Sequence, residues 1–443
     1  MMPPTQAKLQ NQPITVLVHT LSHDGRGITT INGITAFIEG ALPNETVLCQ
    51  ITKKHRHYLE AKTLEVISAA PERTEPKCPH FGVCGGCSLQ HIEAGSQIEF
   101  KQQSLLEQLQ RFGKVAPKEI LAPLTGSSWG YRRRARLGVK YVKKKGRVFV
   151  GFREKMSNLL TDLKICLVLH PKIGERLTDL TLLIGSLTQY EHIPQIEVAV
   201  GDNEAALVFR HMSELPAEDL NKLSAFGQKF QLSIYLQPNP PAPITKLWPK
   251  DSQELLTYAL PEYQLNMQFH PLDFVQINGE INQHLINLAL TLLAPESTDA
   301  ILDLFCGLGN FTLPLARYAK QVTGIEGAKE MVKRAQQNAV LNQINNVDFH
   351  TANLMEPSDS FPWLQKKYDK ILLDPPRTGA KEIIPYLAKL SAKRIVYVSC
   401  NPATLARDAG ELVYNLGYTF KKAAVINMFP HTNHIEAIAL FEK

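Results

Sequence analysis

Between residues 10 and 70 the chain consists of short stretches in which apolar and polar positions alternate. Apolar runs at 14–18, 35–38 and 46–51 are separated by turns such as Asp24-Gly25-Arg26-Gly27. Alternation with a period of two residues, interrupted this often by turns, is typical of half-buried β-strands. The pattern predicts a small five-stranded β-barrel over residues 10–70.

The last third of the chain has a different pattern, in which continuous apolar runs alternate with stretches of helical periodicity. The apolar runs lie at 300–304, 321–326, 370–374 and 394–398. Strands that are apolar on both faces are typical of a parallel sheet covered by helices on both sides. We expect a doubly wound, Rossmann-like α/β domain over residues 265–443, with its ligand site at the carboxyl ends of the strands.

Residues 71–264 lie between these regions and combine both kinds of pattern. They begin with the segment 71–76, whose sequence PERTEP is typical of a linker, and continue with a helical stretch near 97–112. From about 131 to 258, strand-like and helical patterns alternate without a nucleotide-binding signature, and the proline-rich segment 237–243 predicts a loop. We expect a central domain of mixed α+β structure.

The composition limits the classes of protein that fit. The chain has 443 residues, 44% of them hydrophobic, which is enough for two or three domain cores. No apolar run approaches the roughly 18 residues that span a bilayer, and the start lacks a secretion signal. We expect a cytoplasmic protein with no membrane contact, and nothing in the sequence requires more than a monomer. Seven cysteines, an odd number, favour metal binding or thiol chemistry over a disulfide framework.

Basic residues are concentrated in two places, although the formal net charge is only +6. The segment 131–147 contains nine lysines and arginines and no acid, with Tyr131 and Tyr141 among them. The stretch 53–58 is basic as well and would lie on or beside a strand of the barrel. Such clusters attract polyanions, which favours nucleic acid as the partner and an OB-like barrel that binds it. The alternatives are a solvated hairpin edge and a barrel that serves only as a structural cap.

A glycine loop follows the first strand of the α/β domain. The segment 305–312, FCGLGNFT, opens a helix, and its glycines let backbone N–H groups approach a ligand. Thr312 stands where a dinucleotide fingerprint has its third glycine, which argues against a pyrophosphate-bearing cofactor. Glu326 ends the next strand, where a carboxylate can accept both hydroxyls of a ribose. Together these features favour an adenosine nucleoside.

Two further strand ends complete this candidate site. Asn353 follows the third strand of the domain, where its amide could meet an adenine edge, although an ordinary turn asparagine fits equally well. Asp374 ends the following strand, and Pro375-Pro376 after it stiffen the loop and fix the direction of the aspartate side chain. Aspartate followed by two prolines is typical of methyltransferases that place a planar base beside the methyl donor. The pattern favours S-adenosylmethionine (SAM) as the cofactor.

Cys400 follows the next strand and would face the same crevice as Asp374. A lone cysteine at a strand end is usually a small apolar filler. Beside a methyl donor, however, Cys400 could act as a nucleophile, because C5 of uracil accepts a methyl group only after a thiolate has added to C6. The base that then removes the C5 proton could be Glu436, His431 or His434 of the last strand region. We favour Glu436, because a partly buried carboxylate with a raised pKa suits that step.

A second group of cysteines lies at the start of the central region. Cys78, Cys84 and Cys87 fall within ten residues, with glycines between them that let a loop wrap round a metal centre. Cys166 is the remaining cysteine outside the barrel and the α/β domain, and is therefore the natural fourth ligand. Four thiolates hold either a [4Fe–4S] cluster or zinc, and the spacing does not decide between them. We expect the other two cysteines, Cys49 and Cys306, to be packing residues.

Taken together, these motifs resemble those of the RNA (uracil-C5)-methyltransferases, in particular the RlmD type that acts on bacterial 23S ribosomal RNA. The resemblance covers nearly the whole chain. It implies that the N-terminal barrel is a TRAM domain, and that the four cysteines hold a [4Fe–4S] cluster rather than zinc. It also implies 23S rRNA as the partner.

The resemblance also implies roles for individual residues. The segment 274–278, FVQIN, matches the family's entry to the catalytic domain and implies that Gln276 is a cofactor ligand. Cys400 becomes the nucleophile and Glu436 the base. The implied SAM-binding residues are Gln276, Phe305, Asn310, Glu326, Asn353 and Asp374.

Two other functions are consistent with parts of the sequence. One is a uracil-C5 methyltransferase that acts on tRNA or on another rRNA uridine, against which the barrel argues by resemblance. The other is a non-catalytic RNA-binding factor for ribosome assembly. In that case the cysteine cluster and the basic segments are functional and the α/β domain is catalytically inactive. The joint presence of Gln276, Asp374, Cys400 and Glu436 argues against a silent domain.

Overall fold

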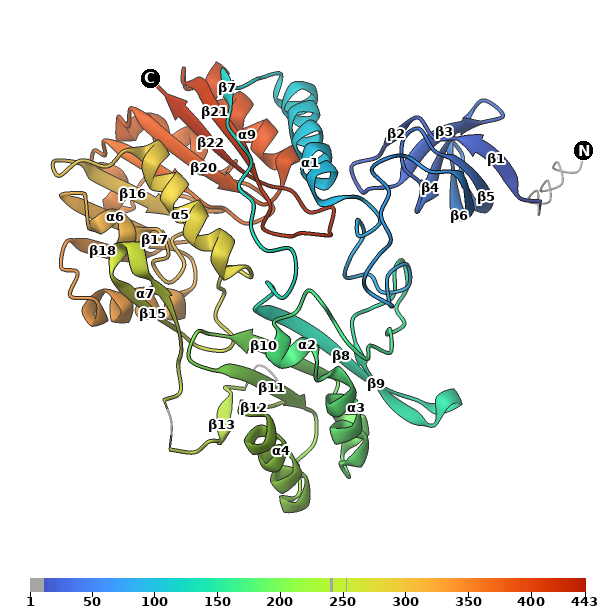
Figure 1. The fold of residues 1–443 in the computed structure, drawn as a ribbon. Coiled ribbons are helices and arrows are strands. Elements are labelled where there is room, and N and C mark those ends of the chain that lie inside the picture. Colours follow the sequence, from blue (N-terminus) through green and yellow to red (C-terminus); the bar gives the residue numbers. More distant parts are fainter. Residues whose placement is uncertain (1–11, 240–241, 252) are drawn as a thin grey trace, which may run out of the picture. The chain divides into compact units, whose positions relative to one another are not determined.

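The structure is a computed structural model that describes residues 12–239, 242–251 and 253–443 (Figure 1). The chain divides into two compact units. The first extends to Phe100 and includes two short later segments, Glu154–Met156 and His431–Asn433. The second comprises all other residues from Lys101 onward. The predicted start of the barrel at residue 10 and two prolines of the segment 237–243 lie outside the described residues. In the part of the chain that is described, no helix is long and apolar enough to cross a membrane.

The first unit contains one sheet, in the order β1-β5-β6-β4-β3-β2. Five strands were predicted, whereas the described residues form six, because the turn in which Ser22 binds the backbone of Arg26 separates the short β2 from β3. Alternate side chains of the strands enclose an apolar core around Ile38, Val47 and Cys49. The strands are β1 (Ile14–Leu17), β2 (Thr20–Leu21), β3 (Gly27–Ile31), β4 (Ile34–Glu39), β5 (Thr46–Lys54) and β6 (Tyr58–Ser68).

The segment 71–76, predicted to be a linker, is bound to this sheet. Glu45 is fully buried, and its carboxylate accepts hydrogen bonds from the guanidinium of Arg73 at 2.5 and 2.7 Å. The same guanidinium donates to the carbonyl oxygen of Gly40 at 2.7 Å. A buried carboxylate needs such partners, so Arg73 is part of the fold of the first unit. The linker prediction was therefore wrong.

The second unit contains a mixed sheet in the order β13-β12-β11-β10-β8-β9. Helices α3 (Leu177–Ser186) and α4 (Ala217–Phe230) pack against it, and α4 forms the crossover between the parallel pair β11 and β12. This is the α+β arrangement expected from the sequence. The strands are β8 (Arg134–Val142), β9 (Arg147–Gly151), β10 (Gln195–Val200), β11 (Ala205–His211), β12 (Leu232–Pro238) and β13 (Thr245–Trp248).

A larger sheet of eight strands follows, in the order β18-β17-β16-β19-β20-β22-β21-β7. The first five strands are parallel, and β22 is inserted antiparallel between β20 and β21. The four strands predicted from apolar runs are confirmed as β16, β17, β19 and β20. The bounds are β16 (Ala300–Leu304), β17 (Gln321–Glu326), β18 (Val347–Thr351), β19 (Lys370–Leu373), β20 (Arg394–Ser399), β21 (Thr419–Ile426), β22 (Glu436–Glu442) and β7 (Glu119–Ile120).

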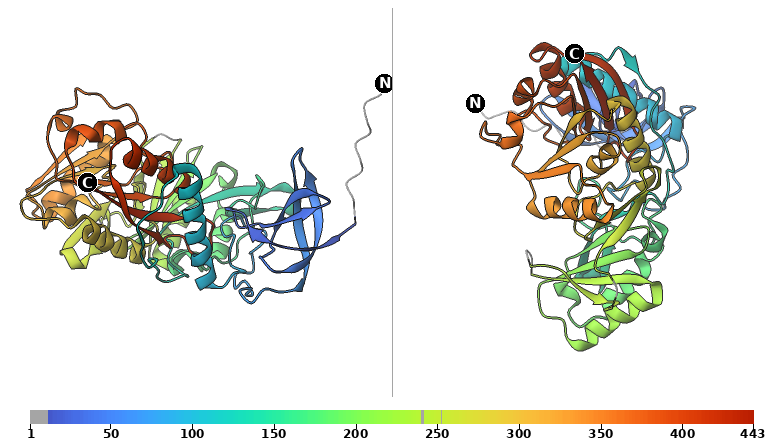
Figure 2. Two further views of the ribbon diagram at one scale, coloured as in Figure 1. Left: turned by 90° about the horizontal axis from the view of Figure 1, so that it is seen from above. Right: turned by 90° about the vertical axis from the view of Figure 1, so that its left-hand side faces the viewer.

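Helices cover both faces of this sheet (Figure 1 and Figure 2), which confirms the doubly wound architecture. One apolar core contains side chains of α5 (Gly279–Leu293), α6 (Thr312–Ala316) and α7 (Lys329–Leu341). The other contains side chains of α1 (Ala94–Gln108), α8 (Ile384–Leu387) and α9 (Pro402–Tyr414). The strands between them are apolar on both sides, as parallel strands in such a sandwich must be.

Residues well before the α/β region contribute to this sheet. Leu105 and Leu109 belong to the core on the α9 face. Strand β7 pairs with β21 at the edge of the sheet, and the backbone N–H groups of Leu121 and Leu124 continue that pairing. A two-stranded sheet of β14 (Leu256–Leu260) and β15 (Leu265–Phe269) leads into α5. The core therefore draws on segments outside 265–443.

Candidate active site

The glycine loop connects β16 to α6 at the carboxyl end of the sheet. Its first residue, Phe305, has a left-handed backbone conformation with φ of +67°, which costs a residue with a side chain about 1 kcal/mol. Gly307 and Gly309 also have positive φ, at +56° and +94°. The N–H groups of Phe305 and Cys306 both donate to the carbonyl of Ile325, which fixes the loop against β17.

Glu326 lies at the end of β17 beside this loop. One carboxylate oxygen accepts a hydrogen bond from the N–H of Gly307 at 3.2 Å, and the other accepts one from the N–H of Ala328 at 2.9 Å. The carboxylate is thus held at the point where two neighbouring parallel strands end. Ligands of doubly wound sheets usually bind there.

Asn353 follows β18 and is exposed. Its side-chain oxygen accepts a hydrogen bond from the N–H of Met355 at 3.1 Å, so the side chain closes a turn. This is the turn geometry predicted from the sequence as the alternative to a contact with adenine. The NH₂ group and the second lone pair of the oxygen remain available to bind a ligand.

Asn310 lies in the glycine loop and is bonded to two residues that the sequence analysis did not single out. Its side-chain oxygen accepts hydrogen bonds from the hydroxyl of Tyr258 at 2.9 Å and from the amide of Asn282 at 3.0 Å. Its own NH₂ group donates to the side-chain oxygen of Asn282 at 2.9 Å. Tyr258 and Asn282 belong to β14 and α5, and neither lies in a recognisable motif.

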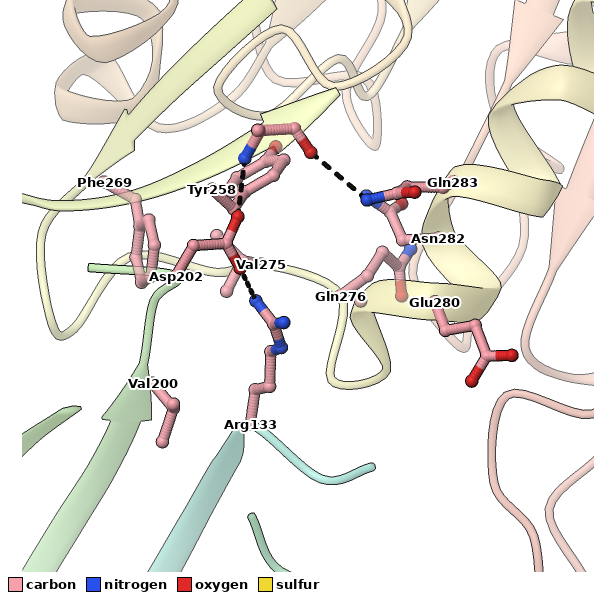
Figure 3. A pocket seen from close by; sticks show the side chains of 12 residues that line it. Arg133, Val200, Asp202, Tyr258, Phe269, Val275, Gln276, Glu280, Asn282 and Gln283 are labelled. Carbon is pink, nitrogen blue, oxygen red and sulfur yellow. Dashed lines mark hydrogen bonds and ion pairs between the residues drawn. The ribbon is translucent and has the colours of Figure 1, made fainter. Parts of the chain in front are cut away.

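Gln276 lies in the loop between β15 and α5 and lines a cavity of about 240 Å³. Tyr258 and Asn282 line the same cavity, together with Arg133, which is paired with Asp202 (Figure 3). The cavity therefore adjoins the residues that bind Asn310. The walls contain both apolar groups and hydrogen-bonding groups, as in small-molecule sites.

The structure brings Cys400, Asp374 and Glu436 together at the ends of adjacent strands. Ser399 in β20 is opposite Ala437 in the antiparallel strand β22, so Cys400 and Glu436 are the next residues at this strand end. Asp374 ends β19, the neighbour of β20 on the other side.

The loops that follow β19 and β20 are also tied to each other. The amide of Asn401 donates to the carbonyl oxygen of Arg377 at 3.0 Å, and the hydroxyl of Thr404 donates to the same oxygen at 3.3 Å. These bonds join the loop after Asp374 to the start of the helix after Cys400. The relative position of the two side chains is thus fixed by the fold.

Burial raises the pKa values of all three groups, and neighbouring carboxylates add to the shift for Glu436 and Cys400. Burial raises the pKa of Asp374 to about 7. Burial, reinforced by Asp374, raises the pKa of Glu436 well above its usual range. Burial and the carboxylates of Glu436 and Asp374 raise the pKa of the Cys400 thiol to about 11, although Arg377 lowers it somewhat. A cluster of coupled titratable groups in a strand-end crevice is typical of a catalytic site.

Asp303 is a further buried acid that the sequence analysis passed over. It is fully buried in β16, and its carboxylate accepts a hydrogen bond from the hydroxyl of Thr312 at 2.5 Å. Burial raises its pKa to about 7, helped by Asp374 and Glu326. The signal was present in the sequence, because Asp303 interrupts an otherwise apolar strand.

The two histidines considered as alternative bases have other surroundings. His431 belongs to the first unit, where its backbone N–H and its ring contact the side chain of Gln97. His434 is exposed, and burial of part of its ring together with Arg377 and Arg132 lowers its pKa. Glu436 is the candidate whose buried carboxyl lies beside Cys400.

Cys78, Cys84 and Cys87 lie in one loop of the first unit and are half-buried. The sulfur of Cys84 accepts a hydrogen bond from the N–H of Gly86 at 3.4 Å, and the N–H of Cys78 donates to the side chain of Gln90. Cys166 is buried in the second unit. Among the described residues, no group of three or more His, Cys, Asp or Glu side chains is arranged to hold a metal ion.

The two cysteines predicted to be packing residues are buried. Cys49 belongs to the core of the first unit, and Cys306 is buried in the glycine loop. Burial raises the pKa of both thiols, that of Cys306 most strongly. A buried thiol with a raised pKa is inert, which fits the prediction for both.

The basic segment 131–147 forms the start of β8 and the β8–β9 hairpin at the edge of the mixed sheet. Its arginines are partly engaged inside the unit, since Arg136 pairs with Glu197 and Arg147 with Asp162. Its lysines are exposed, and three of them form the hairpin tip, Lys143–Lys145. The arginines thus stabilise the hairpin while the lysines present positive charge to solvent, and nucleic-acid binding by this segment stays a prediction.

Comparison with known proteins points to one family. The profile of the family described as tRNA (Uracil-5-)-methyltransferase matches residues 252–443, and that of the TRAM domain matches residues 7–64. A Hahella chejuensis protein named 23S rRNA (uracil(1939)-C(5))-methyltransferase RlmD is 52% identical over 441 residues, covering 98% of each chain. Proteins of the same name from Alkalilimnicola ehrlichii and Legionella pneumophila (strain Lens) are 50% and 46% identical, each covering 98% of both chains.

A solved structure resembles the whole chain as well. It is the tRNA (uracil-54, C5)-methyltransferase of Pyrococcus abyssi in complex with S-adenosyl-L-homocysteine, with a TM-score of 0.73 and 24% identity. The match covers 97% of this chain and 100% of that one, and it shows a common fold. The identities to the RlmD proteins extend over nearly the full length and show more than the fold. By these identities the chain belongs to the RNA (uracil-C5)-methyltransferases, and among them to the RlmD type.

Proposed function

We propose that this protein transfers the methyl group of SAM to C5 of a uridine in 23S rRNA. The observation that carries the proposal is the position of Cys400 beside Glu436 at the ends of β20 and β22, with Asp374 at the end of β19. The RlmD relatives, whose names state this activity, support the choice of substrate.

The proposed reaction begins when Cys400, as a thiolate, adds to C6 of the uracil ring. The electron pair of the C5–C6 double bond moves to form an enolate, so that C5 becomes nucleophilic and attacks the methyl group of SAM. S-adenosylhomocysteine leaves. Glu436 then takes the proton from C5, the C5–C6 double bond re-forms and the C6–S bond breaks, which returns Cys400 as a thiolate.

The raised pKa values determine how this cycle starts. With a pKa of about 11, the thiol of Cys400 is protonated in the free protein at neutral pH. It must therefore lose its proton as it attacks the ring. Burial raises the pKa of Asp374 to about 7 and its charge acts on Cys400, so its carboxylate would accept that proton.

The SAM-binding residues in this proposal come from four strand ends and from the loop before α5. Glu326, held by two backbone N–H groups, would accept hydrogen bonds from the ribose hydroxyls. Phe305 and Asn310 lie in the glycine loop next to it. The proposed set is Gln276, Phe305, Asn310, Glu326, Asn353 and Asp374.

We further propose that Cys78, Cys84, Cys87 and Cys166 hold a [4Fe–4S] cluster. The donor chemistry fits, because four thiolates are the usual ligands of such a cluster, and the loop of the first three is glycine-rich. The cluster would have a structural role. No step of the methylation requires an electron transfer.

RNA would be bound by the TRAM region and by the lysines of the β8–β9 hairpin. Residues 53–58 lie at the end of β5, in the following turn and at the start of β6, where the rings of His55 and Tyr58 stack at 4.1 Å. Stacked aromatics among basic side chains suit single-stranded RNA. In this division, 10–70 binds RNA, 71–264 carries the cluster and the basic hairpin, and 265–443 catalyses methyl transfer.

The test uses 23S rRNA transcribed with 5-fluorouridine, in which fluorine at C5 cannot be removed as a proton. With SAM, the wild-type protein is expected to form a covalent adduct that survives denaturation, and Cys400→Ala is expected to form none. With ordinary rRNA, Glu436→Gln is expected to accumulate a methylated adduct that turns over slowly. Absence of any adduct would contradict the proposed chemistry, and an adduct with tRNA alone would redirect the substrate.

A further inference from the structure

The amide of Asn310 is held in one orientation by two neighbours. Its oxygen accepts hydrogen bonds from Tyr258 and Asn282, and one N–H donates back to Asn282, all at 2.9–3.0 Å. Asn282 is 4% exposed, whereas Asn310 and Tyr258 are half-buried. The three residues come from the glycine loop, β14 and α5, and the fold places them together.

The hydrogen-bond donors and acceptors of Asn310 that its neighbours do not use can be counted. An asparagine side chain has two lone pairs on oxygen and two N–H groups. Both lone pairs are used, by Tyr258 and Asn282, and one N–H is used by Asn282. One N–H remains. Asn310 can therefore donate one hydrogen bond to a ligand, and the ligand must supply the acceptor.

The opposite orientation of the amide is disfavoured by Tyr258. If the amides of Asn310 and Asn282 were both reversed, the hydroxyl of Tyr258 would accept a hydrogen bond and its own proton would lose this partner. Leaving that proton without a partner is unfavourable. Burial also raises the pKa of Tyr258 far above its ordinary value, so the phenol keeps its proton and remains a donor. Tyr258 thus selects the orientation of Asn310.

SAM offers few groups that need a donor at this place. In the proposed site its ribose hydroxyls bind Glu326 and its adenine edge, which also carries acceptors, lies at Asn353, while its ammonium group is itself a donor. The carboxylate of its methionine portion is an acceptor only. The cavity lined by Gln276, Tyr258 and Asn282 (Figure 3) includes the two residues that hold Asn310, and it provides room for that portion.

We infer that Tyr258 and Asn282 are positioning residues, which orient the amide of Asn310 to donate a hydrogen bond to the methionine carboxylate of SAM. The inference rests on the proposed function, since it requires SAM to be the cofactor. Through Tyr258, the segment before residue 265 would then help to recognise the amino-acid end of the cofactor.

The test compares two ligands by isothermal titration calorimetry. One is S-adenosylhomocysteine, and the other is its decarboxylated analogue S-adenosyl-3-thiopropylamine, which keeps the amine and lacks the carboxylate. Tyr258→Phe removes one hydroxyl and keeps the ring. It is expected to weaken binding of S-adenosylhomocysteine about 5-fold to 10-fold and to leave binding of the analogue unchanged. Asn282→Ala is expected to show the same selectivity.

Tyr263→Phe is the matched control. The hydroxyl of Tyr263 donates to the side-chain oxygen of Asn287, also on α5, at 2.6 Å, but that pair does not contact Asn310. Its removal is expected to leave the affinity for both ligands unchanged. Unchanged binding of the analogue also shows that the Tyr258 variant is folded.

Two results would overturn the inference while leaving the proposed function intact. These are an equal loss of affinity for both ligands in Tyr258→Phe, and no loss for either. Failure of the wild-type protein to bind S-adenosylhomocysteine at all would remove the proposed cofactor and this inference with it.

Discussion

Glu436 lies beside Cys400 at the adjoining ends of two antiparallel strands, and its buried carboxyl helps to raise the pKa of the thiol to about 11. Alkylation of Cys400 by iodoacetamide, followed by peptide mass spectrometry, should therefore be slow at pH 8 and accelerate up to about pH 11. In Glu436→Gln the midpoint should move to lower pH, because one negative charge is gone, yet stay above 9 because burial remains. Glu442→Gln, at the far end of β22, is the control. An unchanged midpoint in Glu436→Gln would contradict the assignment.

The proposed [4Fe–4S] cluster predicts the metal content of the protein. Anaerobic purification should yield about four iron atoms per chain and little zinc. Replacing Cys78 or Cys166 by serine should remove most of the iron, since each supplies one thiolate. Cys306→Ser should retain it, because Cys306 is buried in the glycine loop. Stoichiometric zinc without iron would overturn the cluster assignment.

The buried ammonium group of Lys101 predicts a rise of stability with pH. It is fully buried and donates to the side chain of Asn427 and to the carbonyl of Phe429, both at 2.9 Å. Burial lowers its pKa from 10.5 to about 7. Between these values the unfolded chain binds more protons, so the free energy of unfolding increases with pH, by up to about 1.4 kcal/mol per pH unit.

Denaturant unfolding of the wild type and of Lys101→Met at pH 7, 8.5 and 10 measures this effect. The difference between the two proteins isolates the contribution of Lys101 from that of other groups that titrate in the same range. Lys118→Met, which alters an exposed lysine of the same unit, should follow the wild type. The same pH dependence in Lys101→Met as in the wild type would contradict the prediction.

The buried pair of Glu45 and Arg73 predicts the behaviour of the first unit in acid. Although burial opposes it, hydrogen bonds from Arg73, Leu42 and Ala70 lower the pKa of Glu45 below 4.5. The stabilisation is therefore complete above pH 4.5 and is lost as the pH falls through the folded pKa. Glu45→Gln leaves Arg73 without its counter-charge and should cost roughly 3–5 kcal/mol in chemical unfolding. Glu39→Gln, which breaks a more exposed pair with Lys155, should cost less than about 1 kcal/mol.

The lysines at the tip of the β8–β9 hairpin predict a salt-dependent contribution to RNA binding. Replacing Lys143, Lys144 and Lys145 by alanine should weaken binding of a 23S rRNA fragment and reduce the slope of log K against log salt by about 2 to 3. Fluorescence anisotropy over a range of salt concentrations measures both. The triple variant of Lys366, Lys367 and Lys389 removes the same charge from another exposed surface and should leave the slope unchanged.

The sequence was most informative where a local pattern determines local structure. The apolar runs predicted β16, β17, β19 and β20 correctly, because strands buried on both faces require apolar residues at nearly every position. The insertion of β22 between β20 and β21 was not predicted, since strand order depends on pairings between distant segments. For the same reason the residues that hold Asn310 were missed. Asn282 and Tyr258 are 28 and 52 residues away from it in the chain, and only the fold joins them.

The short strand β7 has a consequence for any attempt to produce the catalytic domain by itself. Its backbone pairs with the outer edge of β21, although β7 (Glu119–Ile120) lies far before residue 265 in the chain. In a fragment of residues 265–443, the N–H and C=O groups on the outer edge of β21 that pair with β7 would lose their partners. The apolar surface against which Leu105 and Leu109 pack would be exposed. Unprotected sheet edges recruit strands from other molecules. Such a fragment should precipitate or self-associate, so that solubility of the catalytic part depends on residues that take no part in catalysis.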